Sequence, residues 1–183
     1  IVVHLREDRR HIKERDLFLL RKTVKTRLNL EMSLSQEIVE IACKAKPDQA
    51  TLVPEKRQEL TTEGGLDVIA NYRKIKKARA LLNKNNIQLS LFIDPDKSQI
   101  AAAADLGIDM IELHTGSYAD AKTSVRRNKL LKQIRQCTDY ASRKMITVNA
   151  GHGLDYNNVS PIAKINNIEE LNIGYSIICR AVF

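Results

Sequence analysis

The sequence lacks the features of membrane and secreted proteins. No apolar run approaches the ~20 residues of a membrane span, and no basic segment with a following apolar stretch opens the chain. The three cysteines, Cys43, Cys137 and Cys179, are an odd number, lie far apart and have no metal-ligand spacing. We therefore expect free thiols in a reducing, cytoplasmic compartment, with no membrane contact and no bound metal.

Aromatic residues are also scarce, at 4% of the chain, although the net charge is +8. No aromatic side chain interleaves with the basic runs, such as Arg73–Lys77 and Arg126–Lys129, as a base-stacking surface requires. These runs fall on predicted helix faces, which indicates solvated surfaces. We expect no nucleic-acid partner. Nucleic-acid binding stays the alternative interpretation of the net positive charge. Part of this charge would also suit the binding of phosphorylated substrates.

Short apolar runs alternate with longer segments of helical period along the chain. The strand candidates are Ile1–Leu5, Leu28–Met32, Ala50–Pro54, Ile87–Ile93, Met110–His114, Met145–Asn149 and Glu170–Ile173. The helix candidates are Lys13–Lys25, Ser35–Ala45, Asp67–Lys84, Ser98–Leu106, Asp120–Ser142 and Asn157–Lys164. This order predicts an α/β protein with a parallel sheet, either doubly wound or closed as a (β/α)8 barrel.

The four histidines lie at the ends of predicted strands or shortly beyond them, at His4, His11, His114 and His152. Ligands of parallel α/β proteins bind at these strand ends, so the placement indicates an enzyme. Polar residues end nearly every strand, which favours a (β/α)8 TIM barrel. Because such a barrel has eight strands and about 250 residues, we expect residues 1–183 to be a single-domain fragment with strands 2 to 8. It would lack the first strand–helix unit and the C-terminal helix.

His4 and Arg6 are two residues apart on a predicted strand and therefore point to the same side. They place a titratable base beside a fixed cation, and Arg6 with His11 would suit a phosphate group. The other interpretation is that Arg6–Arg10 is a solvated charge cluster at the start of a helix. The nearby helix start favours anion binding.

Two glutamates stand inside apolar strands, Glu31 in the second strand candidate and Glu112 beside His114. A salt-bridged core carboxylate is one explanation. The other is that each glutamate faces a pocket, where partial burial raises the pKa of the carboxyl toward that of a useful base. The repetition at equivalent strand positions favours the functional interpretation.

Two further segments are candidates for phosphate binding. The polar residues 54–65, with Thr61 and a Gly-Gly pair, form either a loop that closes on a phosphate or an exposed linker. Gly151 and Gly153 flank His152, and glycines let the backbone approach a ligand closely. The chain has no Walker A or dinucleotide-binding motif. We therefore expect a cofactor-free acid–base reaction on phosphorylated carbonyl substrates.

Seven blocks of the chain resemble the pyridoxine 5′-phosphate synthases, the ring-closing enzymes of deoxyxylulose-dependent vitamin B6 synthesis. The blocks are His4–Ile12, Asn29–Met32, Leu52–Asp67, Ser90–Asp94, Glu112–Lys122, Val148–Leu154 and Leu171–Gly174. The resemblance implies a (β/α)8 barrel that condenses two phosphorylated small molecules, 1-deoxy-D-xylulose 5-phosphate and 3-amino-2-oxopropyl phosphate, without a cofactor. The products would be pyridoxine 5′-phosphate, phosphate and water, and the assembly a homo-octamer built from dimers.

The resemblance also implies a role for each candidate residue. His4 would be a general acid–base group, Glu31 a general base in the early condensation, and His152 a proton donor in later steps. Glu112 would stabilise the transition state. The substrate-binding residues would be Arg6, His11 and Thr61 for deoxyxylulose phosphate, and Gly153 and Gly174 for the phosphate of the aminoketone. Tyr175 stands where the family has a histidine, and its phenol would donate a hydrogen bond to that phosphate.

Two other functions remain alternatives to the synthase. One is a different phosphate-binding barrel enzyme, an isomerase or aldolase, which would turn over a single sugar phosphate. The other is a catalytically impaired remnant of the same family, which would show no turnover even when supplied with complete flanking segments.

Overall fold

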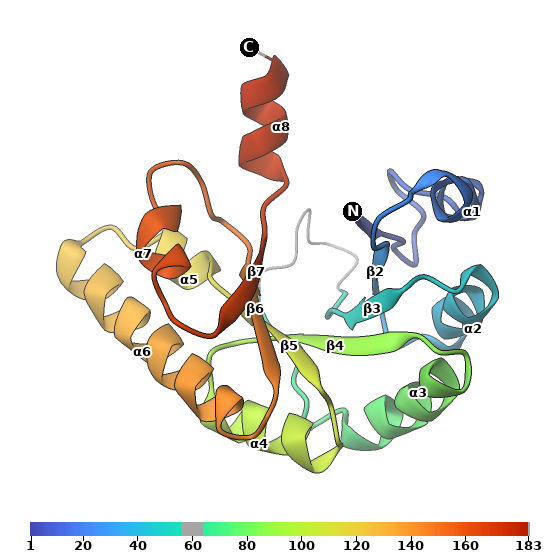
Figure 1. The fold of residues 1–183 in the computed structure, drawn as a ribbon, viewed down its shortest axis with the longest axis horizontal. Coiled ribbons are helices and arrows are strands. Elements are labelled where there is room, and N and C mark those ends of the chain that lie inside the picture. Colours follow the sequence, from blue (N-terminus) through green and yellow to red (C-terminus); the bar gives the residue numbers. More distant parts are fainter. Residues whose placement is uncertain (56–63, 183) are drawn as a thin grey trace. The chain divides into compact units, whose positions relative to one another are not determined.

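The computed structural model describes residues 1–55 and 64–182, and these fall into two compact units that meet in sequence between Phe92 and Ile93. Each unit repeats the order strand, then helix (Figure 1). A single domain spanning residues 1–183 stays a prediction. Among the helices of the described residues, none is both long enough and apolar enough to cross a membrane.

The first unit is built on parallel strands that pair in the order of the chain. These are β1 (Val2–His4), β2 (Asn29–Met32), β3 (Gln49–Leu52) and β4 (Gln88–Ile93). Helices α1 (Glu14–Thr23), α2 (Gln36–Ala45) and α3 (Tyr72–Lys84) lie along one side of these strands (Figure 1). Helix α2 begins where the Ser35 hydroxyl accepts a hydrogen bond from the Ile38 N–H, and it ends at Lys46 with a left-handed φ of 51°.

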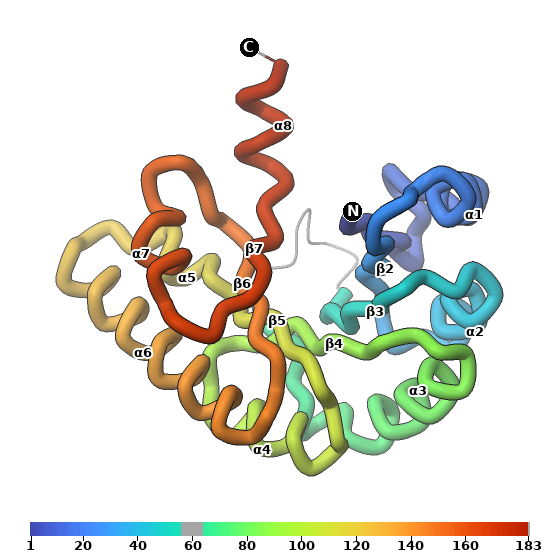
Figure 2. The backbone as a smooth tube through the Cα atoms, in the orientation of Figure 1, coloured from blue at the N-terminus to red at the C-terminus, as the bar shows by residue number. Residues whose placement is uncertain are grey.

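The second unit also has parallel strands in chain order. They are β5 (Met110–His114), β6 (Thr147–Gly151) and β7 (Ile168–Asn172). The helices are α4 (Lys97–Asp105), α5 (Gly116–Ala119), α6 (Ser124–Ser142), α7 (Val159–Ala163) and α8 (Tyr175–Val182). The long helix α6 packs against α4, α5 and β6, and Figure 2 traces its path beside that strand.

Three helix predictions need correction. The helix expected over Asp120–Ser142 begins only at Ser124, because the Thr123 hydroxyl accepts the Arg126 N–H and caps a new helix after α5. The helix expected from Asp67 begins at Tyr72, after a turn. No helix was expected after the last strand, but Tyr175–Val182 form α8. The other predicted helices and strands are confirmed to within a few residues.

Successive parallel strands, each followed by a helix, are the repeating pattern of the (β/α)8 barrel, and the predicted fold class is confirmed. In the first unit the register pairs His4 with Glu31, Glu31 with Thr51, and Thr51 with Ser90. Side chains alternate between the faces of a strand, so these four polar residues share one face. Apolar residues such as Leu30 alternate onto the helix-covered face.

We expect the Leu30→Ala variant to lower the free energy of unfolding by about 2–5 kcal/mol, because Leu30 is fully buried and its loss leaves a cavity. Urea unfolding followed by circular dichroism measures this change. Leu19→Ala is the matched control, since Leu19 on α1 is 54% exposed and should cost at most about 0.5 kcal/mol. Equal stability of the two variants would contradict the assignment of Leu30 to the core.

Candidate active site

His4 and Glu31, both predicted to move protons, lie side by side. His4 is the last residue of β1, and its register partner on β2 is Glu31. The distance from His4 Nδ1 to Glu31 Oε2 is 3.7 Å, so the two groups are neighbours without a direct hydrogen bond between them. Both side chains are partly covered, with 20% of His4 and 26% of Glu31 exposed.

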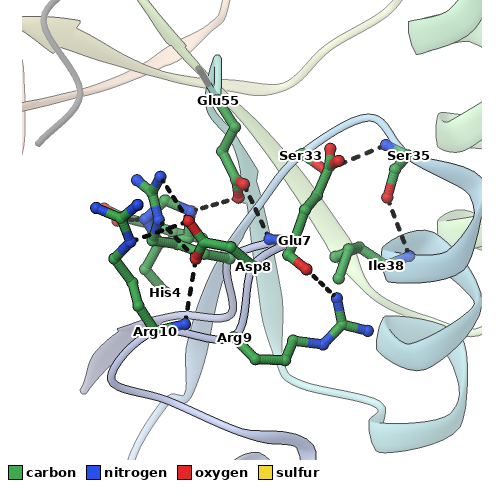
Figure 3. A network of polar contacts seen from close by, with 11 residues as sticks. His4, Glu7, Asp8, Arg9, Arg10, Ser33, Ser35, Ile38 and Glu55 are labelled. Carbon is green, nitrogen blue, oxygen red and sulfur yellow. Dashed lines mark hydrogen bonds and ion pairs between the residues drawn. The ribbon is translucent and has the colours of Figure 1, made fainter. Parts of the chain in front are cut away.

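Glu55 is the closer carboxylate to His4, and the sequence analysis missed it. Its Oε1 lies 2.8 Å from His4 Nε2, and its Oε2 accepts the backbone N–H of Glu7 at 2.9 Å. Figure 3 shows the Glu55 side chain reaching from the segment after β3 toward both partners. Only 6% of the side chain is exposed. Carboxylates are common in polar loops, so the sequence carried no signal that this one is buried against a histidine.

The two carboxylates around His4 differ in pKa. Burial raises the pKa of Glu31 above its ordinary value, and the nearby His4 offsets only part of this effect. Burial acts in the same direction on Glu55. There, however, the hydrogen bonds from His4 and the Glu7 amide, with the charges of His4 and Arg6, outweigh burial and lower the pKa. Carboxyls whose environments separate their pKa values are suited to different acid–base tasks.

Arg6 is buried, so the solvated-cluster interpretation is wrong for this residue. It is 6% exposed, and its Nε and Nη2 each lie 3.3 Å from a carboxylate oxygen of Asp8. Asp8 also accepts the Nε–H of Arg10 at 2.9 Å. The hydrogen bond from Arg6, helped by the Arg10 amide and both arginine charges, lowers the pKa of Asp8 to about 2. A buried guanidinium at a strand end is suited to binding an anion.

Arg9 fixes the same segment to the neighbouring helices. Its Nε donates to Glu14 of α1 at 2.8 Å, and its Nη2 contacts Glu37 of α2. Its φ of 55° and that of His11, 71°, are both left-handed, so the chain turns sharply here. His11 itself is exposed.

Glu112 occupies a buried position on β5, with 3% of the residue exposed. Asn172 of β7 donates from Nδ2 to Glu112 Oε2 at 2.5 Å. On the strand between them, a Cβ added to Gly151 would overlap Glu112 Oε1. Glycine at position 151 is therefore needed for the carboxylate to lie against the backbone of β6.

His152 lies beside a second histidine at the end of β5. The rings of His114 and His152 meet edge to face with 5.2 Å between their centroids, and Asp94 Oδ1 lies 2.9 Å from His114 Nδ1. Burial lowers the pKa of His152, and the neighbouring His114 lowers it further, while Asp120 opposes them. The lowered pKa favours a neutral His152 near pH 7. In this form the imidazole accepts a proton before it donates one.

Thr115 holds the backbone that carries His152. The φ of His152 is 80°, which a residue with a side chain adopts only under strain. The buried Thr115 hydroxyl lies 2.7 Å from the carbonyl oxygen of Gly151 and 2.6 Å from that of His152, and its single hydrogen is shared between these two acceptors. The Thr115 N–H also donates to the Gly151 carbonyl at 2.8 Å. The sequence carries no signal of this role, because a threonine after a strand has many uses.

The predicted phosphate-binding residues have different surroundings. Gly153 has a φ of 75°, and a Cβ there would lie 2.8 Å from the Cβ of Ala119. Gly174 is exposed, and a Cβ there would meet nothing within 4 Å. Tyr175 is 86% exposed at the start of α8. Thr61 lies outside the described residues, so its role stays a prediction.

The chain belongs to the family described as pyridoxal phosphate biosynthesis protein PdxJ, whose model matches residues 1–183. It is 56% identical over 182 residues to a pyridoxine 5′-phosphate synthase of Pelobacter propionicus, covering 100% of this chain and 76% of the relative. A synthase of the same name from Prochlorococcus marinus is likewise 56% identical with the same coverage. That of Aliivibrio fischeri is 55% identical over 183 residues, covering 100% of this chain and 75% of the relative.

Solved structures of low identity share the fold. A FimX EAL domain of Xanthomonas citri, in complex with c-diGMP, matches with a TM-score of 0.57 at 14% identity, covering 84% of this chain and 62% of that one. A xylose isomerase domain protein of Planctomyces limnophilus matches with a TM-score of 0.51 at 14% identity, covering 80% and 61%. At this identity the likeness shows the fold alone.

We expect Gly151→Ala to displace the Glu112 carboxylate, because the new methyl group would take the space of Oε1. Overpacking of this kind typically costs about 1–3 kcal/mol of stability, and turnover should fall with it. Thermal unfolding and the turnover assay described below measure both effects. Gly174→Ala is the control for added methyl volume and should unfold like the wild type, because space is open there. Wild-type behaviour of Gly151→Ala would contradict the close approach of Glu112.

Thr115→Val tests whether the hydroxyl positions His152. Loss of its hydrogen bonds should cost about 1–3 kcal/mol of stability and lower kcat. Thr138→Val is the matched control, because Thr138 is equally buried and its hydroxyl donates to the Ile134 carbonyl within α6. We expect the control to lose stability but to keep kcat. A similar kcat for both variants would show that Thr115 serves stability only.

Proposed function

We propose that this chain is a pyridoxine 5′-phosphate synthase that condenses 1-deoxy-D-xylulose 5-phosphate with 3-amino-2-oxopropyl phosphate. The products are pyridoxine 5′-phosphate, inorganic phosphate and water. The observation that carries the proposal is the match of the family model to residues 1–183, a range that contains His4, Glu31 and His152. Joining an amine to a ketone and closing an aromatic ring requires repeated proton transfers, for which histidine and glutamates of tuned pKa are suited.

In the first unit, Glu31 acts as the general base of the early condensation and His4 as its acid–base partner. The raised pKa of Glu31 supports this role, because a base whose conjugate acid has a pKa closer to 7 both accepts and releases protons effectively. The 3.7 Å between Glu31 and His4 Nδ1 lets both groups act on one reacting centre of a bound substrate.

In the second unit, His152 donates a proton in the later steps and Glu112 stabilises the transition state. The lowered pKa of His152 makes its protonated form a stronger acid than an ordinary imidazolium. The hydrogen bond from Asn172 Nδ2 fixes the orientation of the Glu112 carboxyl group.

The phosphate groups are bound by cations and backbone groups. Arg6, with His11 and Thr61, holds the phosphate of deoxyxylulose phosphate, and the backbone at Gly153 and Gly174, with the Tyr175 phenol, holds that of the aminoketone. The burial of Arg6 supports its part, since a guanidinium binds phosphate more strongly away from water. The protein works in the cytoplasm as a homo-octamer built from dimers, and the reaction uses no cofactor.

Product formation from the two substrates tests the proposal. The chain is mixed with both phosphorylated substrates, and pyridoxine 5′-phosphate is followed by mass spectrometry. The proposal predicts product only when both substrates are present. Conversion of deoxyxylulose phosphate alone would indicate an isomerase or aldolase instead. No conversion by folded protein that also carries any flanking segments of the native protein would indicate an impaired remnant.

Glu31→Gln should lower turnover by at least ~10²-fold. It should also make the protein more stable at neutral pH. The folded pKa of Glu31 is raised, so wild-type stability falls as pH rises from the ordinary carboxyl pKa through the raised value. A neutral amide does not carry that penalty. Urea unfolding at pH 4 and pH 7.5 measures the free energy of unfolding of both proteins. The variant should be more stable than the wild type only at pH 7.5.

The same variant separates function from folding. A Glu31→Gln protein that keeps wild-type turnover would refute the role of general base. A variant less stable than the wild type at pH 7.5 would show that the Glu31 carboxylate contributes stabilising contacts greater than its burial cost.

A further inference from the structure

We propose that Glu55 is a positioning residue that keeps the imidazole proton of His4 on Nε2 and so leaves Nδ1 to exchange protons beside Glu31. This inference rests on the proposed function, because it assigns the nitrogen through which His4 takes part in that reaction. Glu55 acts through His4 and has no contact with the substrate in this role.

The Glu55 carboxylate is held in one orientation by both of its oxygens. Oε1 faces His4 Nε2 at 2.8 Å, and Oε2 accepts the Glu7 amide at 2.9 Å (Figure 3). The side chain is 6% exposed, so water competes little for either oxygen. An acceptor fixed on two sides is able to orient an imidazole ring as well as to select its tautomer.

The charges around His4 favour an ionised Glu55. A neutral imidazole has one N–H and one acceptor nitrogen, and an ionised carboxylate can only accept a hydrogen bond. The pKa of Glu55 is lowered, whereas that of Glu31 is raised, so Glu55 is the carboxyl that stays ionised at lower pH. The proton of neutral His4 therefore lies on Nε2, toward Glu55.

The charged groups facing this pair come from three elements. Glu31 is on β2, Arg6 follows β1 and adds positive charge near Glu55, and Asp8 pairs with Arg6 and limits that effect. Glu55 itself follows β3. With Nε2 occupied by Glu55, the nitrogen left facing Glu31 is Nδ1, at 3.7 Å from its Oε2. A substrate atom or a water between these two groups can exchange a proton with either.

The Glu55→Gln variant tests whether Glu55 keeps the His4 proton on Nε2, because the hydrogen bond from the Glu7 amide orients the new side chain. The Glu7 N–H needs an acceptor, so the glutamine carbonyl oxygen should face Glu7 and its NH2 group should face His4. An NH2 donor requires Nε2 to be unprotonated, so the proton of neutral His4 should move to Nδ1. The nitrogen chemical shifts of ¹⁵N-labelled histidine distinguish the two tautomers in the intact chain.

The expected results are a reversed His4 tautomer and a fall in kcat of about tenfold or more, with little change in KM and an altered pH profile. Glu14→Gln is the matched control, because Glu14 pairs with Arg9 on the surface and should leave the tautomer and kcat unchanged. Glu55→Asp keeps the charge and should keep the wild-type tautomer, with kcat above that of the glutamine variant.

Two results would overturn the positioning role: a Glu55→Gln protein with the wild-type tautomer and pH profile, or Asp and Gln variants that are equally impaired. If Glu55→Gln does not fold, Glu55→Ala takes its place, and a wild-type His4 tautomer and pH profile in that variant would overturn the positioning role. The tautomer is measured without substrate. A wild-type protein that makes no pyridoxine 5′-phosphate but whose tautomer reverses in Glu55→Gln would therefore refute the proposed function and uphold the positioning role.

Discussion

The parallel pairing of β1 with β2 is the constraint on which the acid–base pair of the first unit depends. It puts His4 opposite Glu31 and, through β3 and β4, aligns Thr51 and Ser90 in the same row. The alternate residues of β2, β3 and β4, such as Leu30, Ala50 and Leu89, are apolar and buried. A register shift of one residue would place the polar side chains on the helix-covered face and the apolar side chains on the opposite face. The hydrophobic pattern therefore fixes the position of the acid–base groups.

Electrostatics then gives chemically similar side chains different properties. Glu31 and Glu55 both contact His4, but hydrogen bonds from His4 and the Glu7 amide favour the ionised form of Glu55, whereas burial dominates at Glu31. The second unit relies on neutral donors and on the backbone instead. Asn172 orients Glu112, and the absence of a side chain at Gly151 gives the carboxylate its place.

Fold and function rest on different observations in this protein. Structures that share only 14% of the sequence share the arrangement of strands and helices, and the fold is compatible with many reactions. The family match and identities of 54–56% to the synthases are what connect the chain to vitamin B6 biosynthesis.

The sequence by itself determined the order of parallel strands and helices, because apolar runs and helical periodicity are local properties of the chain. It also indicated His4, Glu31 and Glu112 as candidate site residues, since polar residues inside or at the ends of apolar strands stand out against their neighbours. Only the tertiary structure decided that Glu55 meets His4, a contact between residues 51 positions apart. The same holds for the partners of His152 and Glu112, because hydrogen bonds between distant segments depend on how strands pair and loops close, and a single sequence carries no local signal of either.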